Sequence, residues 1–127
     1  MLMSNFLKNR RSIREFKDRK LNDKVIDKIL ETFKELEEES IGKNFNFILF
    51  RDGEKVYNLL KGVAGYSGVM INSPHYIGVR LKEVNDFSIM EASYFAEKLM
   101  GKLNELNLGS CWVSVKDADK GIKSAAL

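Results

Sequence analysis

Two long stretches of the sequence place apolar residues three and four positions apart, the spacing that gives an α-helix one apolar face. In the first, which follows the potential N-cap Asn22, these residues are Val25, Ile26, Ile29, Leu30, Phe33 and Leu36. In the second, which begins at Asn85 or Asp86 and runs to about Asn107, they are Ile89, Met90, Phe95, Leu99, Met100, Leu103 and Leu106. Because each apolar face must be buried against another layer, the chain is restricted to folds that pack helices on one another or on a sheet.

Shorter runs rich in aromatic and branched residues lie between and after these helices and favour strands. They are Phe45–Phe50, His75–Val79 and Cys111–Val115. Pro74 stands directly before the second run, a position that strands tolerate. Shorter helices are predicted at Ser4–Asn9, through Val56, Leu59 and Leu60, and from Asp117 to Leu127, with a loop at Gly62, Gly65 and Gly68.

The chain of 127 residues fits one domain, 1–127, since roughly 100 to 200 residues per domain is usual. Helices that alternate with strands favour an α+β fold in which helices flank a small mixed sheet. The last predicted helix ends on the apolar Ala125, Ala126 and Leu127. We therefore expect an architecture that is truncated at the C-terminus, or an end that a partner chain covers.

Composition argues against several classes of protein. The longest strongly apolar run, Phe45–Phe50, is far shorter than the roughly 18 residues of a membrane span. The first residues lack the basic start and apolar core of a secretion signal, so we expect a cytoplasmic protein. One cysteine and one histidine offer little to a metal ion, and a net charge of +3 with mixed signs does not indicate nucleic acid as a partner.

A cluster of basic residues near the amino terminus is the first candidate site. Arg10, Arg11, Ser12 and Arg14 place three guanidinium groups and a hydroxyl within five residues. Guanidinium groups donate paired, charge-assisted hydrogen bonds to phosphate oxygens, so this set suits a phosphate monoester. A solvated basic turn is the alternative interpretation of the same cluster.

The sequence from Arg10 to Phe16, which reads Arg-Arg-Ser-Ile-Arg-Glu-Phe, resembles the Arg-Arg-Ser-x-Arg-x-Phe opening of the flavin-dependent nitroreductase family. The glycine-rich loop and strand from Gly65 to Val79 are similar to the same region of its smaller members. Glu91–Leu108 resembles their central helix, and Asn107–Val113 resembles the Gly-Leu-Gly-Ser/Thr-Cys-Trp entry to a strand. The resemblance covers most of the chain from Lys8 to Val115.

This resemblance implies a nitroreductase-like fold with bound FMN. It also implies an enzyme that passes hydride from NAD(P)H to nitroaromatic, quinone or related small acceptors by a ping-pong mechanism. The implied cofactor-binding residues are Arg10, Arg11, Ser12 and Arg14 at the phosphate and ribityl chain, and Ser110, Cys111, Trp112 and Val113 along the ring. No catalytic side chain and no metal are implied, because the flavin carries the chemistry. A homodimer with FMN near its interface is expected.

Two departures from the family pattern leave alternatives open. Asn107 replaces the first glycine of Gly-Leu-Gly, a change that asparagine tolerates because it accepts left-handed backbone angles. Family members generally continue beyond the position of Leu127 with a strand and an arm that embraces the second subunit. A non-catalytic FMN-binding or interaction protein, or a basic domain for another anionic partner, are therefore competing hypotheses.

Other polar residues are given structural interpretations. We expect Cys111 to be a small packed residue rather than a nucleophile, and Cys111–Val113 also fits a plain core strand. His75 invites a proton-donor role but, directly after Pro74, is expected to be structural. Glu91 is assigned to the helix surface or a local ion pair, and Glu37–Glu39 to a solvated last helical turn.

Overall fold

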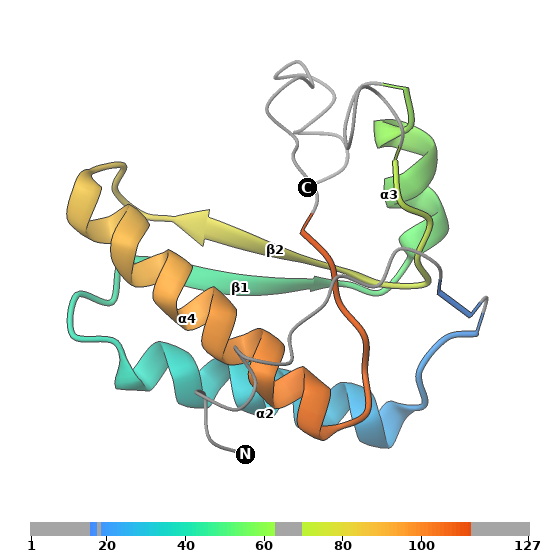
Figure 1. The fold of residues 1–127 in the computed structure, drawn as a ribbon, viewed down its shortest axis with the longest axis horizontal. Coiled ribbons are helices and arrows are strands. Elements are labelled where there is room, and N and C mark those ends of the chain that lie inside the picture. Colours follow the sequence, from blue (N-terminus) through green and yellow to red (C-terminus); the bar gives the residue numbers. More distant parts are fainter. Residues whose placement is uncertain (1–15, 18, 63–69, 113–127) are drawn as a thin grey trace.

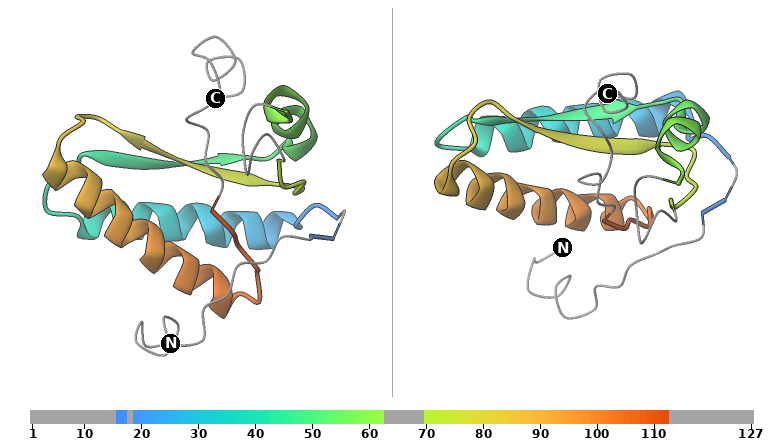
Figure 2. Two further views of the ribbon diagram at one scale, coloured as in Figure 1. Left: turned by 45° about the horizontal axis from the view of Figure 1, so that its top comes forward. Right: turned by 90° about the horizontal axis from the view of Figure 1, so that it is seen from above.

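The computed structural model describes residues 16, 17, 19–62 and 70–112, and these form two layers (Figure 1). In chain order the elements are α2 (Asp23–Glu39), β1 (Phe45–Phe50), α3 (Gly53–Leu60), β2 (Tyr76–Leu81) and α4 (Asp86–Glu105). Helices α2 and α4 pack on the same side of the two strands, and α3 lies at one end of them (Figure 2). The predicted helices at 4–9 and 117–127, and the glycines at 65 and 68, lie outside the described residues.

Helix α2 begins as the sequence predicts, at the asparagine cap. The Asn22 side chain accepts a hydrogen bond from the Val25 backbone N–H at 2.9 Å, which satisfies one of the free donors of the first turn. Ile26, Ile29, Phe33 and Leu36 are buried. Leu30 was predicted to join this face, but it is 42% exposed, so the buried stripe is narrower than expected.

Helix α4 also begins at an asparagine cap, since the Asn85 side chain accepts the Ser88 backbone N–H at 2.9 Å. Its buried apolar face consists of Ala92, Phe95, Ala96, Leu99, Met100 and Leu103. The prediction that Ile89 and Met90 belong to this face is wrong, because both are exposed. The core contacts of the first two turns come from small residues, whereas the large apolar side chains there point outward.

The end of α4 is fixed by a left-handed residue, as expected for the asparagine that replaces the first glycine of the Gly-Leu-Gly motif. Asn107 has φ 61°, and its backbone N–H donates to the Asn104 carbonyl at 3.0 Å. The Leu108 N–H donates to the Leu103 carbonyl at 3.0 Å, which completes the hydrogen-bond pattern of a Schellman motif. The chain therefore leaves the helix in a defined direction.

The described sheet is an antiparallel pair in which Phe45 lies opposite Leu81 and Phe50 opposite Tyr76. β1 has the predicted bounds, while β2 starts and ends slightly later than predicted. The mixed character expected for the sheet is not visible in the described part. The third predicted strand is wrong at its start, since Cys111 and Trp112 adopt no regular structure, and residues 113–115 lie outside the described residues.

The main core lies between the helices and the strands. The aromatic rings of Phe33, Phe45, Phe47 and Phe95 pack in series, with neighbouring centroids 5.3 to 5.4 Å apart. Such contacts add about 0.5–1.5 kcal/mol per pair beyond the area they bury. Within the described residues, no helix is both long and apolar enough to cross a lipid bilayer.

A smaller apolar cluster joins α3 to the segment before β2. Val56 and Leu60 pack on Met70, and Tyr76 packs against the same cluster. The Tyr76 hydroxyl donates to the Ile71 carbonyl and accepts the Ser73 N–H. Asp52 caps α3 by accepting the Lys55 N–H at 3.1 Å. Only two residues therefore separate the end of β1 from the start of this helix.

Candidate functional site

The amino-terminal half of the predicted site is described only at its carboxyl flank. Arg10, Arg11, Ser12 and Arg14 lie outside the described residues, and so does Val113. The described flank is the connection through Lys20 and Leu21 to α2.

Leu21 anchors this connection in two ways. Its side chain packs against the main core, and its backbone N–H donates to the Nε2 atom of His75 at 3.0 Å. This hydrogen bond joins residues that are 54 positions apart in the sequence. His75 therefore has the structural role expected for it, but its partner was not predicted from the sequence.

The His75 ring is held in its neutral form by its surroundings. Partial burial, with the positive charges of Lys20 and Arg51, lowers the pKa of His75 below its ordinary value of 6.5. The Arg51 backbone carbonyl opposes this lowering, although no well-formed hydrogen bond joins it to the ring. Since Nε2 accepts from Leu21, the proton of the neutral ring is assigned to Nδ1, which is buried without a hydrogen-bond partner among the described residues.

The carboxyl-terminal half of the predicted site follows the Schellman motif. Leu108 packs against the main core, and Ser110 and Cys111 are partly buried. The Cys111 thiol lies 3.3 Å from the carbonyl oxygen of the next residue, Trp112. Trp112 is 45% exposed. The interpretation of this segment as a plain core strand is not what the described residues adopt.

The described flanks of the two halves of the predicted site start from the same end of the molecule. α2 begins, β2 begins and α4 ends at this end of the layers, and the segment after α4 turns back toward the sheet (Figures 1 and 2). Leu21 and Leu108 both pack on the same apolar cluster. The flank of the arginine cluster and the tryptophan segment are thus tied to one core.

The residues present fit FMN by the chemistry of their donors. Three guanidinium groups and a hydroxyl match the needs of a phosphate monoester. Ser110, Cys111 and Trp112 lie in neither a helix nor a strand, so their backbone N–H groups are outside any described ladder and can meet ring acceptors. No cluster of three potential metal ligands occurs in the parts of the chain that the structure describes.

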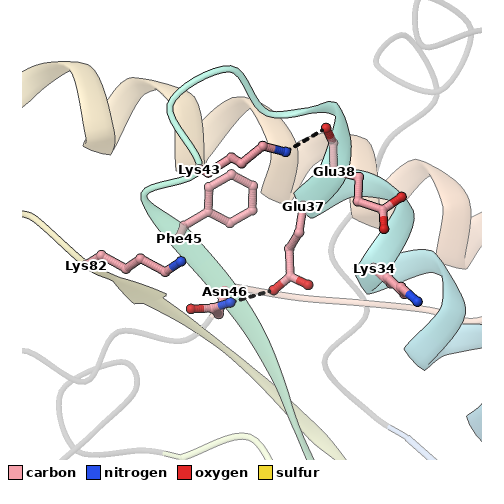
Figure 3. A pocket seen from close by; sticks show the side chains of 7 residues that line it. All are labelled: Lys34, Glu37, Glu38, Lys43, Phe45, Asn46 and Lys82. Atoms are coloured by element: carbon pink, nitrogen blue, oxygen red, sulfur yellow. Dashed lines mark hydrogen bonds between the residues drawn. The ribbon is translucent and has the colours of Figure 1, made fainter.

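A shallow cavity of about 220 Å³ lies at the opposite end, where α2 ends and β1 begins (Figure 3). Its lining comprises Lys34, Glu37, Glu38, Lys43, Phe45, Asn46 and Lys82. The Glu37 carboxylate accepts the Asn46 side-chain amide at 3.1 Å and the Phe47 N–H at 3.0 Å, and Lys43 donates to the Glu38 carbonyl. These groups serve local structure, and the cavity contains none of the predicted site residues. Glu37 is therefore not the merely solvated residue that was expected.

Glu91 also differs from its predicted role. Its carboxylate accepts the Ser40 hydroxyl at 2.6 Å and the Gly42 N–H at 3.1 Å, which ties α4 to the loop after α2. These hydrogen bonds, the Ser40 hydroxyl foremost, hold the pKa of Glu91 below its ordinary value. The sequence carries no signal for this contact because its partners are about fifty residues away.

An exposed apolar stripe runs along the amino-terminal half of α4. Phe87, Met90 and Tyr94 follow one another at helical spacing, and all are more than half exposed. Ile41, next to the loop that Glu91 holds, is 92% exposed. Large apolar side chains gathered in this way mark an interaction surface more often than a solvated face.

Comparisons with known proteins identify the family of this chain. Residues 3–126 match the family described as "Putative TM nitroreductase". The chain is 27% identical over 124 residues to a Methanothermobacter thermautotrophicus protein named "Putative NADH dehydrogenase/NAD(P)H nitroreductase", with 92% of this chain and 64% of that protein covered. It therefore spans about two thirds of the length of this relative.

A solved structure of a nitroreductase is also similar to this chain. An FMN-dependent nitroreductase from Clostridium difficile R20291 superposes with a TM-score of 0.72 and 34% sequence identity, over 94% of this chain and 75% of that one. The α+β arrangement described above is thus nitroreductase-like. By the match of nearly its whole length, this chain belongs to the nitroreductase family.

Proposed function

We propose that this protein is an FMN-dependent oxidoreductase that passes hydride from NAD(P)H to nitroaromatic, quinone or related small acceptors by a ping-pong mechanism. Family membership and the names of the two similar proteins support this proposal. The observation that carries it is structural. The flank of the arginine cluster and the segment around Trp112 are anchored on one core at one end of the fold.

The protein's part in this chemistry is to bind, orient and shield. When bound, FMN supplies the hydride-accepting and hydride-donating centre. The guanidinium groups of Arg10, Arg11 and Arg14, with the Ser12 hydroxyl, would hold its phosphate and ribityl chain. Backbone N–H groups of residues 110–113 would donate to ring acceptors and stabilise negative charge on them. The Trp112 ring would exclude water from one side of the site.

A homodimer is part of the proposal, with the cofactor site near its interface. The stripe of Phe87, Met90 and Tyr94 supports dimerisation itself, because two copies can cover each other's apolar side chains across a two-fold axis. We place the dimer in the cytoplasm. Sedimentation equilibrium tests the interface: Met90→Lys is expected to shift the protein toward monomer, whereas Asn58→Lys on the exposed face of α3 is not.

Flavin titration tests the cofactor assignment. Replacing one guanidinium that holds the phosphate removes charge-assisted hydrogen bonds of about 1.5–3 kcal/mol, so Arg11→Ala is expected to weaken FMN binding roughly tenfold to hundredfold. Arg80→Ala removes the same charge from the exposed part of β2 and serves as the matched control. Equal affinity of the two variants would contradict the assignment.

Anaerobic addition of NADH or NADPH to the FMN complex then tests turnover. Bleaching of the bound flavin, and its recovery on addition of a quinone, is the expected result. A complex that binds FMN but is not bleached would instead favour the alternative function, a non-catalytic flavin-binding or interaction protein.

A further inference from the structure

His75 is the single histidine of the chain and is used by no step of the proposed chemistry. Its backbone is fixed by Ser73, whose hydroxyl donates to the His75 carbonyl at 2.7 Å and accepts the His75 N–H at 3.4 Å. The ring is therefore presented from the residue directly before β2. Its Nε2 atom accepts a hydrogen bond from the Leu21 N–H. Leu21 precedes the Asn22 cap, so its N–H has no carbonyl acceptor within α2.

This hydrogen bond depends on the protonation state of the ring. A neutral imidazole has one acceptor nitrogen, whereas an imidazolium has two donors and no acceptor. Protonation at Nε2 would place an N–H directly against the Leu21 N–H. The contact would change from attraction to repulsion, and the Leu21 N–H would lose its hydrogen bond to the His75 side chain.

The charges around the ring favour this break once the proton is added. Lys20 approaches from the connection itself and Arg51 from the end of β1, and both are positive. An imidazolium between them would repel the connection through Lys20 as well as through the Leu21 amide. These are the charged groups that face the ring among the described residues.

We propose that His75 is a positioning residue, whose neutral ring holds the Leu21 amide and thereby fixes the connection between the arginine cluster and α2, and whose protonation releases that connection. This inference rests on the proposed function, because the cluster it positions is the one assigned to the FMN phosphate. Only seven positions separate Arg14 from Leu21. Acid is therefore expected to weaken FMN binding in two ways: by protonating His75, which releases the connection, and by protonating the flavin phosphate.

The direction of the pH effect follows from the lowered pKa of His75. The neutral, anchored state is fully populated above the ordinary value of 6.5. The anchor is lost as the pH falls through the lower value of the folded protein. Between these two values the unfolded chain binds more protons than the folded one, so folding stability also decreases as the medium becomes more acidic.

NMR of the flavin-free protein tests the anchor directly. The one imidazole gives an unambiguous titration. The Leu21 amide reports the hydrogen bond through its protection factor, which is the exchange rate of an unstructured amide divided by the observed rate. In the wild type, protection of Leu21 is expected to fall at least tenfold with the same midpoint as the His75 titration. In His75→Gln, whose amide oxygen can accept without titrating, protection is expected to persist across the range.

Flavin affinity of the same two proteins tests the consequence. The FMN phosphate itself titrates near pH 6, so both proteins will lose some affinity in acid. Between about pH 7.5 and pH 5, the FMN affinity of the wild type is expected to fall about threefold or more beyond the fall seen in His75→Gln. The reason is that acid depopulates the state in which the Leu21 amide is anchored. The inference would be overturned if FMN affinity fell equally with pH in the two proteins, or if protection of the Leu21 amide did not change with the His75 titration. If no protein bound FMN, the proposed function would fail, while the Leu21 measurement would still decide the role of His75.

Discussion

Gly53 gives the sharpest stability prediction, because a side chain there would enter space occupied by backbone. A Cβ atom built on Gly53 would lie 2.1 Å from the Ser73 carbonyl oxygen and 2.5 Å from that of Pro74. The Gly53 N–H also donates to the Pro74 carbonyl at 3.0 Å. Neither carbonyl can rotate away as a flexible side chain would. In Gly53→Ala, α3 must therefore move off the segment before β2.

The cost can be worked from these contacts. Overpacking that shifts backbone costs about 1–3 kcal/mol. Loss of the hydrogen bond between Gly53 and Pro74 adds about 1–3 kcal/mol if its groups stay buried. The better helix propensity of alanine returns at most about 1 kcal/mol. We expect a net loss of about 3 kcal/mol from the free energy of unfolding.

Urea denaturation, followed by circular dichroism, measures this change. With a slope of about 2 kcal/mol per molar urea, the midpoint of Gly53→Ala should fall by roughly 1.5 M. Asn58→Ala, at an exposed position of the same helix, should leave the midpoint within about 0.3 M because surface substitutions are nearly neutral. A Gly53→Ala midpoint equal to that of the wild type would refute the close backbone approach.

Two further predictions concern α4. The pKa of Glu91 is lowered in the folded state, so the ionised carboxylate stabilises the fold above the ordinary pKa of 4.5, and this stabilisation is lost as the pH falls through the lower folded pKa. Glu91→Gln should therefore have a lower urea midpoint than the wild type at neutral pH. The difference between the two midpoints should close in acid. Asn107→Ala should destabilise by about 1 kcal/mol because of its φ of 61°, while Asn107→Gly should not, and equal thermal midpoints for the two would contradict the left-handed cap.

Local features of this fold could be predicted because they depend on neighbouring residues. The Asn22 cap, the bounds of Phe45–Phe50 and the left-handed turn at Asn107 each follow from a few adjacent side chains. The exposure of Leu30 and Met90 could not be predicted in this way. Helical spacing identifies which residues share a face, but the partner layer decides how far around the helix burial extends.

The polar contacts between elements could not be predicted at all. The hydrogen bonds of His75 with Leu21, and of Glu91 with Ser40, join residues more than fifty positions apart. Their existence depends on how the topology brings loop ends together, and single-sequence patterns carry no record of that. The flavin-binding residues were reached by resemblance, and the structure adds the core on which both described flanks of the site are anchored.

The position of Glu37 affects what can pair with the side of β1 that faces away from β2. The Lys82 N–H donates to the Asn44 carbonyl, and that register turns the Phe47 N–H away from β2, toward the side of β1 that has no partner strand among the described residues. β1 reads Phe-Asn-Phe-Ile-Leu-Phe, a composition prone to intermolecular cross-β stacking when its border is bare. Because the Glu37 carboxylate occupies that amide, a chain that paired with β1 on this side would first have to displace a negative charge.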